Sequence, residues 1–308
     1  MTAAGVDVGK DFLDLAIDGR ARTTRFSNDA AGRRKLIRGL AGLDDAFVVV
    51  EATGGYEDAL LDACVDAGLH VARINPRQSN AFARAIGELA KSDAIDARLL
   101  CLFARLFRDR LRCHVPAPPW QRELRAWLRR RGQVVITLQA QKQQANRTPT
   151  AVRTLIHRTM AALRRELAAI EQAMKVLVDA NGTAAIRSSK GMGPIFQATT
   201  LALLPELGRL SRRQIAKLVG VAPMARESGN SQGRRRIRGG RASMRVALYM
   251  ATLSAVRCDP AMKAHYRQLR DRGKPAKVAL VACMRKLLTI VNARRRDELR
   301  ASGELAPD

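Results

Sequence analysis

Four acidic residues have the types and spacing of a divalent-metal site. Asp7 lies inside the apolar segment "GVDVG", where a buried carboxylate is costly unless it has a partner such as a metal ion. Glu51 closes the apolar run "FVVVE", and Asp93 and Asp96 stand three apart in "KSDAIDARLL", so they share one face of a helix. Two Mg²⁺ or Mn²⁺ ions about 4 Å apart bind such oxygens and bridge the attacking and leaving oxygens of a phosphodiester. The set predicts an RNase H-like nuclease core, with Lys91 offsetting part of the negative charge.

A simpler role is open to Asp93 and Asp96 taken alone. Acidic side chains in the first turn of a helix interact favourably with the helix dipole and need no ligand. Asp7 argues for the metal site, because an acid between valines in a buried strand has no such explanation.

The segment 226–245, "RESGNSQGRRRIRGGRASMR", is the densest basic stretch, and guanidinium groups suit bidentate phosphate binding. Its arginines are Arg226, Arg234, Arg235, Arg236, Arg238, Arg241 and Arg245. Ser228 lies among them, and its hydroxyl is a poor nucleophile unless metal ions or arginines stabilise the developing charge. Ser231 and Ser243 are equal rivals by position, and the tyrosine alternatives are Tyr56 and Tyr249. The simpler interpretation is a flexible basic loop that grips nucleic acid without chemistry.

Charge is divided unevenly along the chain, whose formal net charge is +27. Residues 1–120 contain 17 Lys or Arg and 16 Asp or Glu, a net of +1, whereas residues 121–308 contain 38 and 12, a net of +26. The second part therefore calls for a polyanion partner, and DNA or RNA fits better than a membrane because no aromatic-rich amphipathic helix accompanies the cations. Further candidates for nucleic-acid binding are Lys190, Lys274 and Lys277.

Other features of the composition point to the cytoplasm. The five cysteines are scattered without a C-x-x-C, which argues against a disulfide framework or a zinc knuckle. No apolar run reaches 18 residues, and the N-terminus lacks the pattern of a signal peptide. We expect a cytoplasmic, nucleoid-associated protein that does not bind membranes.

The elements that would position these residues fall into three segments. Residues 1–114 alternate short apolar strands with helices, the pattern of an α/β domain. Residues 115–182 hold the proline-rich linker "VPAPPW" followed by long helices. Residues 183–308 form a mostly α-helical domain, in which "IRSSKGMGPIFQATTLALLPEL" predicts a helix, a glycine turn and a second helix. Such a turn can present backbone N–H groups to a phosphate.

A heptad repeat marks the second segment. Apolar residues spaced 4-3-4-3-4-3 form a coiled-coil seam: Ile156, Met160, Leu163, Leu167, Ile170, Met174 and Leu177. The seam fits a homo-oligomer, dimer or tetramer, and equally fits a hairpin with the preceding helix of the same chain.

Several stretches together resemble a known family. They are "GVDVGK", "VVVEATGGYE", "AGLHVARINPRQSNAFARAIGELAKSDAIDARLLCLFA" and "ESG" followed by "GGR" and "ALYMATLSA". In this order they are similar to the DEDD-type transposases of insertion-sequence family one-ten, relatives of the Piv DNA invertases. The resemblance covers nearly the whole chain. It departs at "KGMGP", where family members often have a proline before the glycines, and at the arginine-rich "GRRRIRGG".

The resemblance implies more than the spacing does. It implies a RuvC-like N-terminal domain whose Asp7, Glu51, Asp93 and Asp96 bind divalent metal, a coiled-coil segment, and a C-terminal transposase domain. It further implies that Ser228 joins covalently to DNA, and that a structured non-coding bridge RNA pairs with donor and target DNA. Oligomers with shared active sites are implied as well. The alternatives are a RuvC-like structure-selective nuclease that uses metal-activated water only, and a protein that binds nucleic acid without catalysis.

Overall fold

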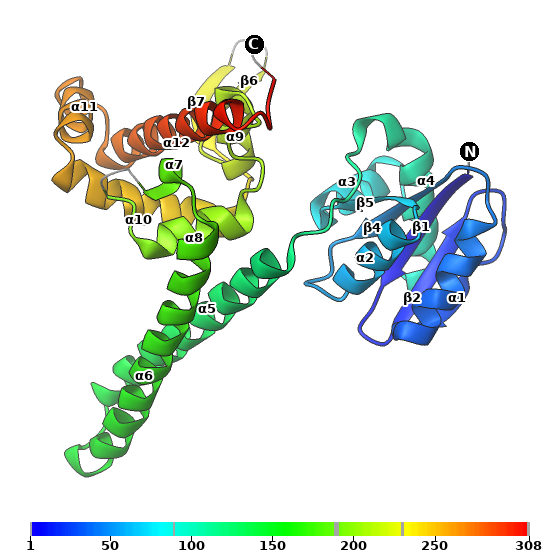
Figure 1. The fold of residues 1–308 in the computed structure, drawn as a ribbon, viewed down its shortest axis with the longest axis horizontal. Helices are drawn as coiled ribbons and strands as arrows, with labels where there is room; N and C mark the ends of the chain where they lie inside the picture. Colours follow the sequence, from blue (N-terminus) through cyan, green and yellow to red (C-terminus); the bar gives the residue numbers. More distant parts are fainter. Residues whose placement is uncertain (1, 89, 188–190, 229–230, 307–308) are drawn as a thin grey trace. The chain divides into compact units, whose positions relative to one another are not determined.

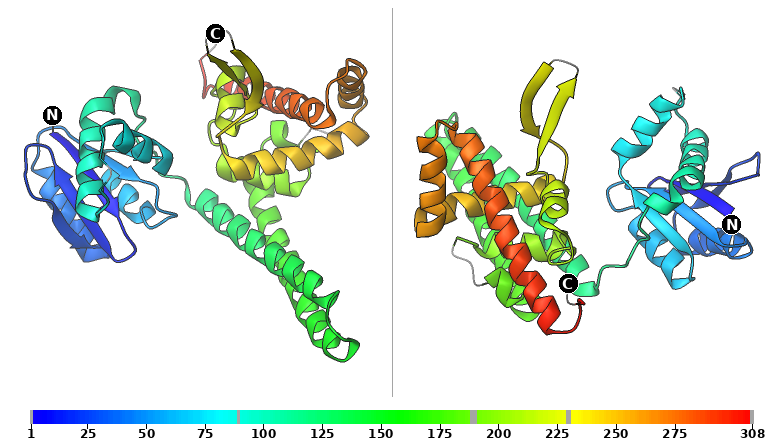
Figure 2. Two further views of the ribbon diagram at one scale, coloured as in Figure 1. Left: turned by 180° about the vertical axis from the view of Figure 1, so that it is seen from behind. Right: turned by 90° about the horizontal axis from the view of Figure 1, so that it is seen from above.

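A computed structural model describes residues 2–88, 90–187, 191–228 and 231–306 of the 308-residue chain (Figure 1; Figure 2). It divides into two compact units, Met1–Ala117 and Pro118–Asp308, and each is described by itself. The boundary falls inside the proline-rich linker expected at 115–120. The further separation of a coiled-coil segment from a C-terminal domain stays a prediction.

The first unit is built on a five-stranded mixed sheet with the order β3-β2-β1-β4-β5. The strands are β1 (Thr2–Val8), β2 (Phe12–Ile17), β3 (Thr24–Ser27), β4 (Ala46–Glu51) and β5 (His70–Ile74). β1, β2 and β3 pair antiparallel, whereas β4 runs parallel to both β1 and β5. The carboxyl ends of β1, β4 and β5 therefore meet at one end of the sheet, which is where open α/β sheets place their chemistry.

Helices cover both faces of this sheet. They are α1 (Ala30–Ala41), α2 (Asp58–Asp66), α3 (Pro76–Ala85), α4 (Asp93–Phe107) and the short 3-10 helix η1 (Arg108–Arg110). Successive strand residues point to opposite faces. In β1, Ala4, Val6 and Val8 join a core with α1 and α2, whereas Ala3 joins a core with α4. The apolar strand residues thus serve two cores, as the nearly continuous apolar runs predicted.

A glycine in β1 lets α4 lie directly against the sheet. A Cβ atom at Gly5 would stand 2.1 Å from the backbone N of Cys101 and 2.4 Å from the backbone O of Ala97. Both neighbours are backbone atoms of α4, so no side-chain movement could make room. This close approach brings the first turn of α4 to the end of β1 where Asp7 lies.

The second unit is mostly helical. Its helices are α5 (Pro119–Ala145), α6 (Thr150–Asn181), α7 (Ala184–Arg187), α8 (Pro194–Leu203), α9 (Arg212–Val219), α10 (Ala242–Cys258), α11 (Pro260–Asp271) and α12 (Ala276–Ala301). A core of α7–α12 residues includes Ile215, Met244, Leu248 and Leu287. No helix in the described part of the chain is long and apolar enough to cross a membrane.

The predicted heptad seam is packed within the chain. Met160, Ile170 and Met174 of α6 are buried, and the last two share a core with Leu124 and Val134 of α5. Ion pairs such as Arg130–Glu166 (2.6 Å) and Arg131–Glu171 (2.8 Å) flank this contact. The seam therefore stabilises a hairpin of α5 and α6, and an oligomer through the same helices stays a prediction.

The basic stretch forms regular structure where the sequence indicated a flexible loop. β6 (Pro223–Ser228) and β7 (Ser231–Ile237) pair as a two-stranded antiparallel sheet, with an irregularity between Met224 and Arg226. The sequence of these strands, rich in glycine and arginine, does not alternate apolar with polar residues. It therefore lacks the usual signal for a strand. The backbone pairing defines this element.

The Gly5 contact leads to a stability prediction. Gly5→Ala should lower the free energy of opening of the first unit by about 3 kcal/mol, the upper end of the usual cost of overpacking, because the added methyl group meets backbone rather than a movable side chain. Hydrogen exchange of β1 and α4 peptides in the full chain measures this quantity.

Gly39→Ala is the matched control. Gly39 lies exposed in α1 with no atom within 4 Å of an added Cβ, so the change should leave stability unaltered or raise it by up to about 1 kcal/mol. Equal protection in the two variants would contradict the role given to Gly5.

Candidate active site

Two of the predicted acids lie at the ends of adjacent parallel strands. Asp7 is the penultimate residue of β1 and Glu51 is the last residue of β4, and the neighbouring residues Val6 and Val50 are paired in register. Asp7 shares the sheet face of Ala3, which packs under α4, and Glu51 shares the face of Phe47 and Val49 in the same core. The sheet therefore points both carboxylates toward α4.

The other two acids begin α4. The Ser92 side chain caps the helix by accepting a hydrogen bond from the backbone N–H of Ile95 at 3.3 Å. Asp93 and Asp96 follow in the first turn, three residues apart and on one side of the helix. Because α4 packs directly on β1, its first turn lies near Asp7.

Burial and the neighbouring acids together perturb the pKa of Asp7. Burial raises this pKa to about 6, and the negative charges of neighbouring carboxylates act in the same direction. These neighbours are, in order of effect, Asp96, Asp93, Glu51 and Asp14. The pKa of Asp96 is also raised, by burial and by Asp93, although Lys91 opposes the change. All four acids predicted from the sequence thus share one negative region.

The acids converge without forming a tight cluster. Among the described residues, no group of three or more His, Cys, Asp or Glu side chains has the spacing that holds a metal ion. Mutual repulsion of carboxylates favours such a spread arrangement. Their chemistry fits a cation nonetheless, because several hard oxygen donors share one region and their charge is only partly compensated.

Two partners of the acids were not predicted. Asp14 of β2 lies opposite Asp7 in register and is only 6% exposed. Arg25 of β3 donates to Asp14 at 2.9 and 3.0 Å and to Asp93 at 2.6 Å. The sequence signal available was Asp14 itself, an acid between two leucines in "FLDLA", much as Asp7 lies between valines.

Glu51 also has an unpredicted partner. Its carboxylate accepts a hydrogen bond from the Ser79 hydroxyl of α3, and that hydroxyl lies 3.0 Å from the carbonyl oxygen of Pro76. Ser79 is buried, and α3 is held at its start by a capping box of Asn75 and Gln78. The end of β4 is therefore tied to the next helix.

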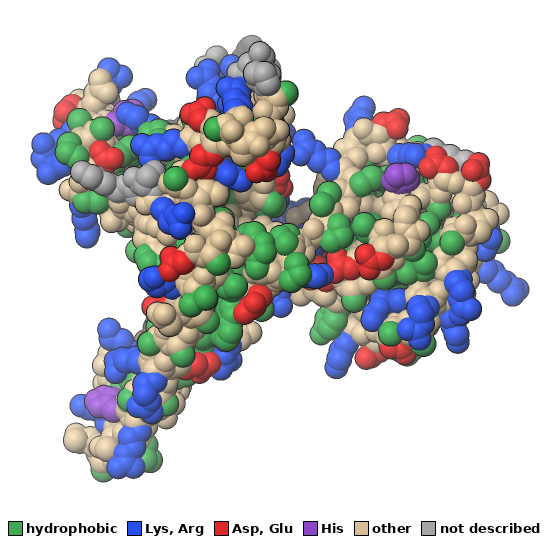
Figure 3. All heavy atoms as spheres, in the orientation of Figure 1, with side chains coloured by type: hydrophobic (Ala, Val, Ile, Leu, Met, Phe, Trp, Pro, Cys, Tyr) green, Lys and Arg blue, Asp and Glu red, His purple; other side chains and the backbone are tan. Residues whose placement is uncertain are grey.

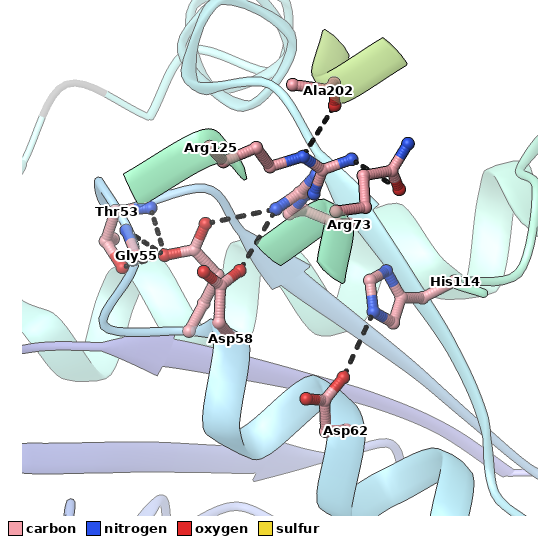
Figure 4. A network of polar contacts seen from close by, with 10 residues as sticks. Thr53, Gly55, Asp58, Asp62, Arg73, His114, Arg125 and Ala202 are labelled. Atoms are coloured by element: carbon pink, nitrogen blue, oxygen red, sulfur yellow. Dashed lines mark hydrogen bonds and ion pairs between the residues drawn. The ribbon is translucent and has the colours of Figure 1, made fainter. Parts of the chain in front are cut away.

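The loop after Glu51 is folded around a buried carboxylate. Glu57 is 2% exposed and accepts hydrogen bonds from the backbone N–H groups of Thr53 (3.1 Å) and Gly55 (2.8 Å) (Figure 4). Arg73 lies 3.6 Å from Glu57 and 3.3 Å from Asp58. Burial alone would raise the pKa of Glu57, but the hydrogen bonds outweigh it and the pKa is lowered. An ionised Glu57 thus gives the loop a fixed shape.

The same loop is tied to the turn that follows β1. The Asn28 side chain donates hydrogen bonds to the carbonyl oxygens of Gly9 (2.9 Å) and Tyr56 (3.3 Å). The side chain of Tyr56, one of the tyrosine alternatives, is about half exposed on this loop. The turn and the loop that flank the acids therefore form one connected rim.

The serine candidate lies in the second unit. Ser228 is the last residue of β6 and pairs in register with its rival Ser231. The structure does not describe the side chains of residues 225–228, 231–232 and 234. The side chains of Ser228, Arg226 and Arg234 are therefore not described. Lys190 lies outside the described residues altogether.

The remaining basic candidates divide into two groups. Arg235, Arg236, Arg238, Lys91, Lys274 and Lys277 are exposed. Arg241 instead makes a bidentate pair with Glu206 at 2.6 Å, and Arg245 donates to the carbonyl oxygen of Gly239 at 2.5 Å. Arg241 and Arg245 are thus engaged in holding the fold. Figure 3 shows further Lys and Arg side chains along the α5–α6 hairpin and around α11.

Interior hydrogen bonds also hold the helices of the second unit. The Arg125 Nε group of α5 donates to the carbonyl oxygen of Ala202 in α8 at 2.8 Å (Figure 4). The Gln121 side chain donates to the carbonyl oxygen of Leu201 at 2.6 Å. These bonds fix α8, which follows the predicted glycine turn, against the α5–α6 hairpin.

Comparison with known proteins finds one family. Residues 4–151 match the IS110-type DEDD transposase domain, described as a transposase, and residues 183–267 match the transposase IS116/IS110/IS902 family. The first match contains all four predicted acids, and the second contains Ser228.

Individual relatives agree with these matches. The pilin gene-inverting protein of Moraxella lacunata is 22% identical over 314 residues, and that of Moraxella bovis is 23% identical over 304 residues. Both alignments cover 94% of this chain and 94% of the relative. An uncharacterized 43.6 kDa protein of the insertion element IS110 from Streptomyces coelicolor is 26% identical over 144 residues, covering 45% of this chain and 35% of that protein.

The crowding of charge at Asp7 leads to a pH-dependent prediction. Because the folded-state pKa of Asp7 is raised to about 6, its contribution to stability is present below about pH 4 and is lost as the pH rises through 6. Asp7→Asn should therefore raise the free energy of opening of the first unit by about 1–2 kcal/mol at pH 8 and give no gain at about pH 3. Hydrogen exchange of β1 peptides at the two pH values checks this.

Asp66→Asn, at an exposed position of α2, is the control and should show no comparable difference between the two pH values. If Asp7→Asn destabilises the unit at pH 8, the acids do not repel one another as described.

Proposed function

The chain belongs to the IS110 transposase family, whose members cleave and transfer DNA strands, and we propose that it recombines DNA with a divalent-metal acidic centre and a serine nucleophile. The observation that carries the proposal is the placement of Asp7 and Glu51 at adjacent strand ends under α4, whose first turn contributes Asp93 and Asp96. Ser228 contributes the nucleophile, and the cationic second unit binds nucleic acid.

The sheet supports an RNase H-like, RuvC-like first domain. Three antiparallel strands β1–β2–β3 are followed by β4 and β5, parallel to β1 on its other side, in the order 3-2-1-4-5. This arrangement puts one acid on the central strand β1 and another at the end of its neighbour β4. Helix α4 adds the remaining two.

The carboxylates of Asp7, Glu51, Asp93 and Asp96 would hold Mg²⁺ or Mn²⁺. When bound, such ions supply positive charge to the scissile phosphate and its entering and leaving oxygens. The protein's part is to orient the acids: Ser79 holds Glu51, and the Ser92 cap starts α4 over Asp7. Residues 1–120 carry a net charge of only +1, so the first unit has no large excess of cations to compensate this negative region.

The serine step requires the Ser228 hydroxyl oxygen to bond to the scissile phosphorus. The bond between that phosphorus and a deoxyribose oxygen breaks, and the released oxygen takes up a proton, leaving a phosphoserine–DNA linkage. Attack by the freed hydroxyl of another strand would reverse the step and restore the serine. Ser228 and the acids belong to different units, so a homo-oligomer in which one protomer's acids meet its partner's serine is part of the proposal.

Nucleic acids are the partners that the charge supports. The +26 over residues 121–308 suits donor and target DNA together with a non-coding guide RNA of the bridge type. Because the substrate is DNA, we place the protein at the nucleoid in the cytoplasm.

Purification from the native host should recover one discrete RNA encoded beside the gene, which sequencing would identify. Recovery of bulk RNA alone would mean that the positive charge gives only a general affinity for polyanions.

The catalytic roles are testable in cells that carry the gene with its native flanking DNA. Asp96→Asn should lower element excision, read as circle junctions by quantitative PCR, by at least about a hundredfold, because charge stabilisation at the phosphate is lost. Ser228→Ala should abolish both excision and the covalent protein–DNA adduct.

Ser243→Ala is the matched control, because Ser243 lies exposed in the first turn of α10 and should be dispensable. Strand cleavage that survives in Ser228→Ala would instead identify a structure-selective nuclease that uses metal-activated water. Excision that survives in Asp96→Asn would rule out the acidic centre.

A further inference from the structure

A row of charged residues crosses three strands beside the acidic site. Asp7 of β1 pairs in register with Asp14 of β2, and Asp14 pairs with Arg25 of β3. Residues directly opposite one another in a sheet share a face. The row therefore lies on the face covered by α4, and Asp14 is a fifth acid at the edge of the four described above.

Arg25 is the cation that faces this fifth acid. Its Nε and Nη2 atoms donate to the two carboxylate oxygens of Asp14 at 3.0 and 2.9 Å. The same Nη2 donates to Oδ2 of Asp93 at 2.6 Å. One guanidinium group thus connects β2, β3 and the first turn of α4.

An aromatic ring restricts the guanidinium further. The Cζ atom of Arg25 lies 5.2 Å from the centroid of Phe12, a cation–π distance. Phe12 begins β2 and lies on the same face as Asp14, two residues on. Phe12 is about half exposed, so the Arg25 side chain beside it borders water. The contact with the ring limits the rotamers that the Arg25 side chain would otherwise sample.

The pair differs from an ordinary surface salt bridge, which contributes little. The Asp14 side chain is 8% exposed, and removing the partner of a buried charge is costly. The geometry is bidentate, which a lysine ammonium cannot reproduce. Arg25 therefore places a positive charge against Asp14 and donates a hydrogen bond to each of its two carboxylate oxygens.

We propose that Arg25 is a positioning residue of the strand-transfer site, which neutralises Asp14 and orients Asp93 toward Asp7. The inference rests on the proposed metal centre and adds two residues that the sequence motif does not include. Charge and geometry are its two separate contributions. The charge offsets part of the negative potential of the site. The two hydrogen bonds to Asp14 fix the guanidinium group, and its third, from Nη2, sets the direction of the Asp93 carboxylate.

Three variants separate these contributions. Arg25→Met removes both, and should bind Mn²⁺ about fivefold more tightly because a positive charge near the ion is gone. It should nevertheless lower excision at least about tenfold, because Asp93 is no longer held. Arg25→Lys keeps the charge and loses the fork, so Mn²⁺ affinity should stay within about twofold of wild type while excision still falls.

The experiment is isothermal titration of the purified full-length variants with Mn²⁺, paired with the circle-junction assay. Arg105→Met is the matched control: Arg105 also lies in the first unit and pairs with an acid, Asp18, at 3.2 Å, but both side chains are well exposed. It should change neither readout. A purely structural role for Arg25 would weaken Mn²⁺ binding and excision together, so tighter binding with slower recombination is the distinguishing result.

Two outcomes would overturn the inference. One is wild-type Mn²⁺ affinity and wild-type excision in Arg25→Met. The other concerns the double variant Asp14→Asn with Arg25→Met, which is used if Arg25→Met alone does not fold, because it removes the buried acidic charge together with its partner. Wild-type excision in the double variant would show that Arg25 only compensates Asp14. Asp7→Asn in the same titration tests the metal centre itself, since unaltered Mn²⁺ binding in that variant would refute the proposed function rather than the role of Arg25 alone.

Discussion

The close approach of α4 to β1 at Gly5 is the contact on which the acidic site depends. Backbone atoms of Ala97 and Cys101 occupy the space that any side chain at position 5 would need. Because the helix cannot lie this close over a larger residue, the glycine determines where its first turn comes to rest. Asp93 and Asp96 are in that turn, and Asp7 is two residues beyond the glycine on the same strand face. A packing constraint with no chemistry of its own thus assembles acids from distant parts of the chain.

The assembled acids act against the stability of the fold that brings them together. Burial and four neighbouring carboxylates raise the pKa of Asp7, which means that the ionised site costs free energy before any cation arrives. Local hydrogen bonds limit that cost: Arg25 compensates Asp14, Ser79 supports Glu51, and backbone amides surround Glu57. Functional sites commonly carry such unfavourable electrostatics because the same charge that destabilises the fold binds the ligand.

Much of the first unit could be predicted from its sequence. The strands at "GVDVG" and "FVVVE" are short apolar runs that drew attention to Asp7 and Glu51, and the helix start at "KSD" drew attention to Asp93 and Asp96. The structure places Asp7 and Glu51 at adjacent strand ends and Asp93 and Asp96 in the first turn of α4, whereas their joint role as metal ligands stays a prediction. Arg25 and Ser79 could not be found in this way, because their importance comes from strand register and from the placement of α3. In the second unit the heptad was visible, but periodicity alone could not say that α6 would pack on α5 of the same chain. The β6–β7 pair was missed because its strands lack an apolar face.

The central claim is that these acids form one cation site, and diffraction from crystals grown with Mn²⁺ tests it most directly. The account predicts an anomalous peak at the end of β1 whose ion contacts oxygens of Asp7 and of at least two among Glu51, Asp93 and Asp96, at about 2.2 Å. Asp14 should remain paired with Arg25 and outside the coordination sphere. A peak bound elsewhere on the chain, with Asp7 left without a cation at saturating Mn²⁺, would contradict the claim.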